Sequence, residues 1–338
     1  MARRRKEPWW ADADTEELLD TRICDLGVSY AGTWVERAVE KAKAELDARG
    51  LVPRPTFWLA AEWLSPDASP GVGVAFYLAH PRLMRLERQQ MLEVEGGTRE
   101  ECLKLLRHEL GHVMQTAYRL HLRRAWRQLF GSVTKRYPEF YRPNPASRKF
   151  VQHLPGWYAQ SHPAEDFAET FAVWLTPRSD WRQRYQGWRA LRKLEYVDEL
   201  MRELQGVRPT VRSRARPFSV SQTRFTLRSY YRRKREHYAV GFTDAYDRDL
   251  KRLFDAPVGK DTAAKFLRRN RSEIRDVVVR WTGEYTFAVD HLMKEMIGRC
   301  QELKLRSRCS VREKWEFAIL LTMHSMSYVL RGREWHAV

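Results

Sequence analysis

The chain has 338 residues, of which 43% are hydrophobic, and its 13 tryptophans exclude a disordered protein. Its formal charge is +18 at pH 7, and no apolar run approaches the ~18 residues that a membrane span needs. The basic amino terminus lacks the apolar stretch of a secretion signal, and the four cysteines show no CxxC spacing. We therefore expect a cytoplasmic protein with reduced thiols, not a disulfide scaffold, a zinc ribbon or a membrane protein.

The positive charge is concentrated in the C-terminal part of the chain. Residues 207–338 carry 29 Lys+Arg against 15 Asp+Glu, whereas residues 1–206 carry 32 against 28. We therefore predict an enzyme-like domain at residues 1–206 and a basic, mainly α-helical region at residues 207–338.

The first elements are a helix and two strands. Residues 33–49 place apolar side chains on one helical stripe and end at Gly50, which predicts a helix. Residues 56–64 and 72–80 are rich in aromatic and β-branched side chains and are separated by a Pro/Gly-rich turn. They predict two adjacent strands of a small sheet.

Two further helices follow in the first 206 residues. Thr98 and Glu101 have the spacing of a capping box and begin a helix that contains "LLRHELGHVMQ". Pro163 suits the first turn of a second helix, "HPAEDFAETFAVWL".

The C-terminal region begins with an arginine-rich stretch, "VRPTVRSRARPFSVSQ", which has no periodicity and predicts an exposed linker or strap. Amphipathic helical patterns follow it: "AYDRDLKRLF", "AAKFLRRNRSEIRDVVVRW", "FAVDHLMKEMIGRCQEL" and "EKWEFAILLTMHSMSYVL".

The motif "HELGH" has the pattern of a zinc site. His108 and His112 are four residues apart, so on a helix both imidazoles project from one face and can share an ion. Glu109 lies beside that face, where it can act as a general base toward a water molecule. Gly111 disfavours a helix by ~1 kcal/mol relative to alanine, which suggests that another element approaches closely at this position.

A catalytic zinc needs a third protein ligand. The metzincin pattern is excluded, because it would require glycine and histidine where this chain has Gln115 and Tyr118. The helix "HPAEDFAETFAVW" instead offers acidic side chains, and its small residues Ala168 and Ala172 would allow tight packing on the Gly111 side.

We favour Glu165 as the third ligand over Asp166, with Glu169 orienting a ligand histidine through its far ring nitrogen. Acidic residues in a first turn also offset the helix dipole, which is the alternative reading of Glu165 and Asp166. His153 and His162 are rival ligands that suit loop or capping roles better.

With these residues the chain resembles the putative zinc-binding metallopeptidases, a family of the zincin superfamily, from about residue 20 to residue 204. The resemblance implies an α+β zincin-like domain with a small mixed β-sheet and two active-site helices. It also implies the roles of individual residues. His108, His112 and Glu165 would be the zinc ligands, Glu109 the catalytic base, and Glu169 a residue that contacts a ligand instead of the ion. In the related lethal factor pattern a tyrosine stands seven residues before the ligand glutamate, which is Tyr158 here.

The chemistry expected from these roles is zinc-dependent hydrolysis of peptide bonds in a peptide or protein substrate. Glu109 would move the proton, and Tyr158 would donate a hydrogen bond to the oxyanion or simply pack. Residues 72–80 are the candidate edge strand for the substrate backbone.

The basic C-terminal region supports a competing function. "RSYYRRKREHY" interleaves arginines with Tyr230, Tyr231 and Tyr238, a pattern that can neutralise phosphates while aromatic rings stack on bases. The alternative to a metallopeptidase is therefore a zincin-derived, non-catalytic binding protein whose basic helices bind nucleic acid or another polyanion.

Overall fold

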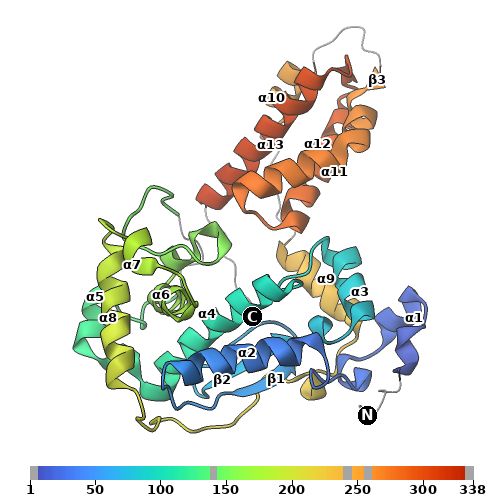
Figure 1. Ribbon diagram of the computed structural model, residues 1–338. Coiled ribbons are helices and arrows are strands. Elements are labelled where there is room, and N and C mark those ends of the chain that lie inside the picture. Colours follow the sequence, from blue (N-terminus) through green and yellow to red (C-terminus); the bar gives the residue numbers. More distant parts are fainter. Residues whose placement is uncertain (1–6, 138–142, 239–245, 255–260, 332–338) are drawn as a thin grey trace. The chain divides into compact units, whose positions relative to one another are not determined.

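The structure, a computed structural model, describes residues 7–137, 143–238, 246–254 and 261–331, with side chains to residue 326. The described residues form two compact units: residues up to 89 together with 94–230, and residues 90–93 together with 231–331. Figure 1 shows the elements of both units coloured along the chain. The structure is α+β, as the resemblance implied, with a small sheet in the first unit and helices in the second.

Helices make up most of the first unit, and two of them, α3 and α9, end in the residue ranges of the second. They are α1 (Thr15–Asp20), α2 (Trp34–Ala48), α3 (Pro81–Met91), α4 (Arg99–Tyr118), α5 (Arg124–Phe130), α6 (Pro163–Leu175), α7 (Trp181–Arg184), α8 (Ala190–Glu203) and α9 (Leu227–Tyr238). The predicted helices at residues 33–49, after Thr98 and at Pro163 are confirmed as α2, α4 and α6.

The sheet of the first unit is a parallel pair, β1 (Thr56–Ala60) with β2 (Gly71–Ala75). Both predicted strands exist, but each is shorter than predicted. The second ends at Ala75 because Phe76–Ala79 forms a turn of 3₁₀ helix.

The prediction that residues 72–80 form a free edge for a substrate peptide is wrong. Leu64 turns back along the outer side of β2 and exchanges two backbone hydrogen bonds with Gly73. The Ser65 hydroxyl donates to Gly71 O at 3.0 Å. The outer edge of β2 is thus occupied at two successive outward-facing residues, and little of it remains for another strand.

Helix α4 is the central element of the first unit. It packs against α2, β2 and α6, and most of its side chains are buried. Ser65 also connects the sheet to it, since its hydroxyl lies 3.1 Å from Glu109 O. On the α2 side, the Arg107 guanidinium makes two hydrogen bonds of 2.7 Å with the Glu45 carboxylate, and both groups are buried. These contacts fix α4 between the sheet and α6.

The predicted strap lies against the first unit. Val207 O accepts from the Tyr118 hydroxyl at 2.6 Å, and Pro217 O accepts from the Trp58 indole at 3.1 Å. Ser69 Oγ lies within 3.2 Å of both Ser213 O and Ala215 O. The contacts of residues 207–230 are therefore with the first unit, and the compact units divide after Tyr230 instead of at residue 206. The division into a metallopeptidase domain at residues 1–206 and a C-terminal region at residues 207–338 stays a prediction.

The second unit contains the predicted C-terminal helices and a two-residue antiparallel strand pair. Its elements include α10 (Asp247–Leu253), β3 (Asp261–Thr262), α11 (Ala263–Thr282), α12 (Thr286–Glu302), β4 (Arg306–Ser307) and α13 (Val311–Arg331). Buried Leu267, Met296 and Phe317 belong to its apolar core. Ala245 of the predicted "AYDRDLKRLF" helix lies outside the described residues.

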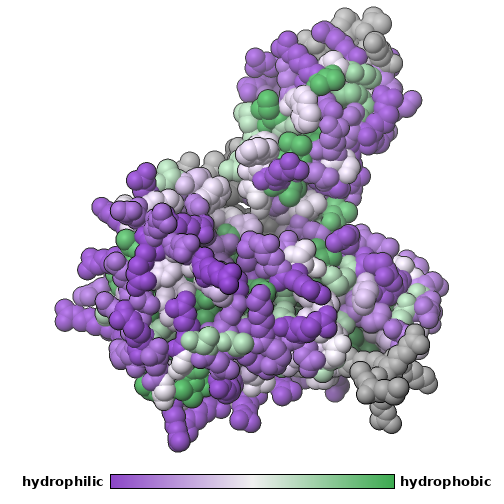
Figure 2. Space-filling view, viewed as in Figure 1, coloured by the Kyte–Doolittle hydropathy of each residue, from purple (hydrophilic) through white to green (hydrophobic). Residues whose placement is uncertain are grey.

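The visible surface is mainly hydrophilic (Figure 2). On α13, however, the side chains of Val311, Ile319 and Met323 are at least 60% exposed. No helix among the described residues is long and apolar enough to cross a membrane.

Candidate metal centre

Helix α4 presents both histidines from one face. Its N-terminus carries the predicted capping box: the Thr98 hydroxyl accepts from Glu101 N, and the Glu101 carboxylate accepts from Thr98 N, each at 3.2 Å. With the helix started at this point, the four-residue spacing brings the rings of His108 and His112 to a centroid distance of 4.9 Å.

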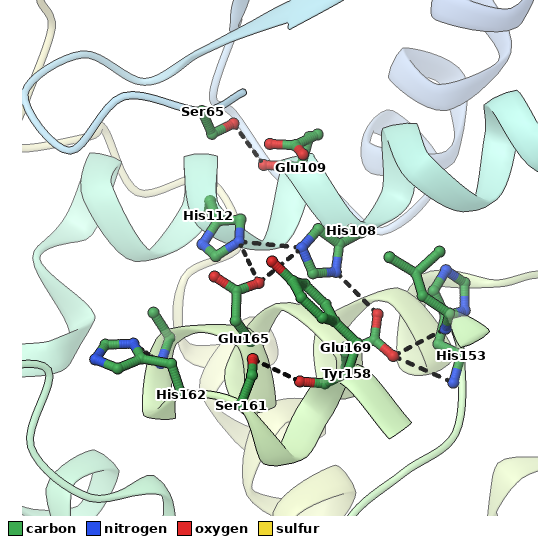
Figure 3. Close-up of polar contacts among 12 residues, drawn as sticks. Ser65, His108, Glu109, His112, His153, Tyr158, Ser161, His162, Glu165 and Glu169 are labelled. Atoms are coloured by element: carbon green, nitrogen blue, oxygen red, sulfur yellow. Dashed lines mark hydrogen bonds and ion pairs between the residues drawn. The ribbon is translucent and has the colours of Figure 1, made fainter. Parts of the chain in front are cut away.

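Helix α6 crosses α4 at its glycine. A Cβ atom added to Gly111 would lie 2.6 Å from Ala168 Cα, so the two backbones approach as closely as the sequence predicted. This contact brings the first turns of α6, with Glu165 and Glu169, next to the histidines of α4 (Figure 3). His162 caps α6, because its Nδ1 accepts a hydrogen bond from Ala164 N.

Three ligand-type atoms converge between the helices. Glu165 Oε2 lies 3.0 Å from His108 Nε2 and 3.2 Å from His112 Nε2, and the two nitrogens are 3.1 Å apart. Among the described residues, these three side chains form the one cluster of histidine, cysteine or acidic residues that could hold a metal ion. Tetrahedral ligands at ~2.0–2.1 Å from a zinc ion would be about 3.3 Å apart, so the residues fit such an ion.

The charges at the centre favour a cation. Burial lowers the pKa of His108, but hydrogen bonds and charge from Glu165 and Glu169 outweigh it and hold that pKa well above its usual range. Burial opposes ionisation of Glu165, yet the two histidines keep the pKa of Glu165 well below its usual range. An anionic carboxylate that stabilises positive charge on imidazoles can equally stabilise a divalent ion between them.

Glu109 lies beside the cluster, and one of its oxygens lacks a partner. Oε2 is buried and has no hydrogen-bond partner among the described residues. A buried carboxylate oxygen without a partner costs free energy unless a ligand or water completes its hydrogen bonding. This oxygen therefore fits a position where a bound water would lie.

Glu169 connects His108 to a loop. Its Oε1 lies 2.9 Å from His108 Nδ1, and its Oε2 accepts from Leu154 N at 2.9 Å and from His153 N at 3.3 Å. In the neutral imidazole, which is the form that binds a metal ion, this contact holds the proton on Nδ1 of His108 and leaves the lone pair of Nε2 for the cluster. These contacts are the ones that the predicted orienting role of Glu169 requires, and that role stays a prediction.

Tyr158 lies close to the ring of His108. It belongs to a 3₁₀ segment, Pro155–Gln160, in which Gly156 and Trp157 have positive φ angles. Its ring centroid is 5.6 Å from that of His108, and Figure 3 shows its hydroxyl directed toward the three converging side chains. The position is compatible with the predicted contact to a reacting carbonyl.

The rival ligands have other partners. His153 Nε2 lies 2.9 Å from Lys104 O, and His162 Nε2 lies 3.0 Å from Lys135 O. Asp166 pairs with buried Lys193 on another side of α6. Burial raises the pKa of Asp166 to about 7, although Lys193 opposes this shift.

Sequence reasoning missed Tyr137, which the structure brings to the centre. Its hydroxyl donates to Glu165 Oε1 at 2.7 Å. Burial, followed by the charge of Glu165, raises the pKa of Tyr137, so the phenol stays protonated and remains a donor. Tyr137 begins the sequence "YPEFYRPNPAS", in which no periodic spacing relates it to either helix.

The aromatic residues predicted to stack on nucleic acid bases are mostly inaccessible. Tyr230 and Tyr231 are buried, and Tyr238 stacks on Tyr285 with a centroid distance of 4.3 Å. The prediction that bases stack on Tyr230 and Tyr231 is therefore wrong, because both side chains are packed inside the protein, whereas Tyr238 is half-buried.

Comparison with known proteins gives one match. Residues 85–186 match the model of a family described as "Putative zinc-binding metallo-peptidase". No curated protein and no solved structure matches the chain. The matched segment spans α4 to α6 and includes all three converging side chains. The match confirms, over residues 85–186, the resemblance that the sequence showed, and these residues carry the whole candidate metal centre.

Proposed function

We propose that the chain is a zinc-dependent metallopeptidase that hydrolyses peptide bonds of a peptide or protein substrate. The observation that carries this proposal is the convergence of His108, His112 and Glu165 within one family-matched segment. Two histidines and a carboxylate are a donor set that suits zinc and leaves a fourth position for solvent or substrate. We expect the enzyme to act in a reducing compartment such as the cytoplasm, where its four free thiols persist.

In the proposed mechanism His108, His112 and Glu165 hold the ion. When bound, zinc lowers the pKa of a water molecule to ~7 and polarises the carbonyl of the scissile bond.

Glu109 is the proposed general base. Its carboxylate accepts a proton as water attacks the carbonyl carbon, and it donates that proton to the departing amine nitrogen. The buried Oε2, which has no hydrogen-bond partner among the described residues, supports this role, because a base needs a free acceptor.

Tyr158 is the proposed oxyanion donor. The carbonyl oxygen becomes negatively charged as the water adds, and the phenol would donate a hydrogen bond to it. The ring contact with His108 supports this role, since it places Tyr158 next to a proposed ligand.

The test is metal content combined with cleavage of an unstructured protein such as casein. We expect about one zinc per chain, loss of cleavage after chelation, and recovery on adding zinc. Glu165→Ala should lose the metal. Cleavage that survives complete chelation, or a Glu165→Ala protein with unchanged zinc content, would contradict the proposal.

A second candidate is polyanion binding by the C-terminal region. The side chains of Arg248, Lys265 and Arg312 are 92%, 67% and 85% exposed, so they can reach phosphates. Each of these three also lies within 4.0 Å of a carboxylate, as do the less exposed Arg271 and Arg299, so part of the positive charge is already neutralised. Retention on heparin that falls steeply with salt would support this function, and no retention at low salt would exclude it.

A further inference from the structure

We propose that Tyr137 is a positioning residue that holds one oxygen of Glu165 so that only the other oxygen faces the two histidines. The inference rests on the proposed function, because it assigns a role toward the same ion. It concerns whether Glu165 would bind the ion through one oxygen or through two, not whether Glu165 is a ligand.

The two oxygens of the Glu165 carboxylate have separate partners. Oε1 accepts the hydrogen bond from Tyr137 at 2.7 Å, whereas Oε2 lies 3.0–3.2 Å from the histidine nitrogens. The Glu165 side chain is only 5% exposed, so bulk water does not compete for either oxygen. The phenol therefore sets which oxygen is directed at the ion.

Tyr137 is itself held in place although it lies in a loop. Its ring stacks on His162, with a centroid distance of 3.8 Å and an interplanar angle of 18°. Both nitrogens of His162 are engaged by backbone groups: Nε2 donates to Lys135 O at 3.0 Å, and Nδ1 accepts from Ala164 N at 3.2 Å. One contact lies two residues before Tyr137 and the other in the first turn of α6. The stack thus fixes the phenol relative to Glu165.

The consequence concerns the number of ligand atoms. A glutamate that binds through both oxygens would fill the position that a catalytic zinc keeps for water or substrate. By engaging Oε1, Tyr137 favours binding through Oε2 alone and keeps that position open. Partners of ligand side chains typically change metal affinity 10–100-fold when they are removed.

This role differs from that of Tyr158. Tyr158 contacts His108 and is proposed to reach the substrate oxygen, whereas Tyr137 hydrogen-bonds to a proposed ligand. Removal of the Tyr137 hydroxyl should therefore change the coordination and the affinity of the metal ion. Removal of the Tyr158 hydroxyl should change turnover alone.

The experiment uses the full chain loaded with Co²⁺, whose visible absorption is stronger in four-coordinate than in five-coordinate sites. Tyr137→Phe keeps the ring that stacks on His162 and removes only the hydroxyl. We expect weaker visible absorption and at least about a tenfold loss of Co²⁺ and Zn²⁺ affinity in competition with a chromophoric chelator.

Tyr118→Phe is the matched control. It also removes one short phenol hydrogen bond, the 2.6 Å contact with Val207 O, at the far end of α4. Its spectrum and affinity should equal those of the unsubstituted protein. If Tyr137→Phe binds Co²⁺ with an unchanged spectrum and affinity, the positioning role is wrong while the metal site stands. If the unsubstituted chain binds neither ion, the proposed function fails as well.

Discussion

Gly111 and Ala168 form the closest approach between the two helices that carry the candidate ligands. A Cβ at position 111 would lie 2.6 Å from Ala168 Cα and 3.0 Å from Ala168 O. Both neighbouring atoms are backbone, so no side chain can rotate away to make room. The separation of His108 and Glu165 therefore depends on the absence of one methyl group.

Gly111→Ala should destabilise the protein although alanine favours a helix by up to ~1 kcal/mol. The added methyl group would clash with the backbone of α6, and such overpacking costs about 1–3 kcal/mol of stability. If α6 moved away to relieve the clash, Glu165 would be separated from the histidines. We expect a lower urea midpoint and weaker zinc binding. The matched control is Gly298→Ala on α12, where an added Cβ meets no atom within 4 Å. Equal stability changes in the two variants would contradict the packing argument.

Glu109→Gln should separate metal binding from catalysis. The amide cannot accept a proton, so hydrolysis should fall about 10²–10⁴-fold, while zinc content stays the same because Glu109 is not a proposed ligand. Glu100→Gln on the same helix is the control, since that side chain is 82% exposed. Activity equal to that of the unsubstituted protein would remove Glu109 from the mechanism.

Glu169→Gln should weaken metal binding without removing a ligand. The carboxylate accepts from the His108 ring and from two backbone N–H groups, and an amide directs an N–H group at one of these donors. Zinc affinity should fall roughly 10–100-fold. The measurement is competition with a chelator, and an unchanged affinity would show that His108 needs no such partner.

Tyr158→Phe should lower turnover by about 10²-fold if its phenol stabilises the oxyanion. Zinc content and the ring contact with His108 should not change. An unchanged kcat would show that Tyr158 only packs against its neighbours. A loss of zinc would show that its hydroxyl is needed for metal binding.

Asp290 should make the stability of the second unit depend on pH. It is fully buried and hydrogen-bonds to the Arg271 guanidinium. Burial raises its pKa, but Arg271 and Lys294 outweigh this and lower it below the usual value. Because the folded pKa is the lower one, its contribution is complete above the unfolded value of ~3.9 and is lost as the pH falls through the folded value.

Asp290→Asn should therefore be less stable than the unsubstituted chain at pH 7, by about 2 kcal/mol. The two proteins should converge in urea unfolding experiments below pH 4. If the difference in the free energy of unfolding stayed constant over this pH range, ionisation of Asp290 would not contribute to stability.

The convergence of the three candidate ligands could be predicted from sequence because much of its geometry is local. A capped helix fixes the relation of His108 to His112, and a second capped helix fixes that of Glu165 to Glu169. The small residues Gly111 and Ala168 indicated that the helices cross closely, which the structure confirms.

Other features depend on contacts that no local pattern encodes. The predicted adjacent strands β1 and β2 run parallel although a short Pro/Gly-rich segment connects them, because Leu64 takes the antiparallel position beside Gly73. The arginine-rich strap looked like a linker, but its carbonyls accept hydrogen bonds from Trp58 and Tyr118. Tyr137 reaches Glu165 through a stack on His162, a relation that has no characteristic spacing in the sequence.

The three contacts of Glu169 restrict how the chain can vary in length. One carboxylate joins a ring on α4 to the backbone at residues 153 and 154, which lie sixteen and fifteen residues before it. Tyr158 lies between these anchors, so a single inserted or deleted residue there would displace it or break the contact at Leu154. We therefore expect related sequences to keep the number of residues between positions 154 and 169 constant, whatever their composition.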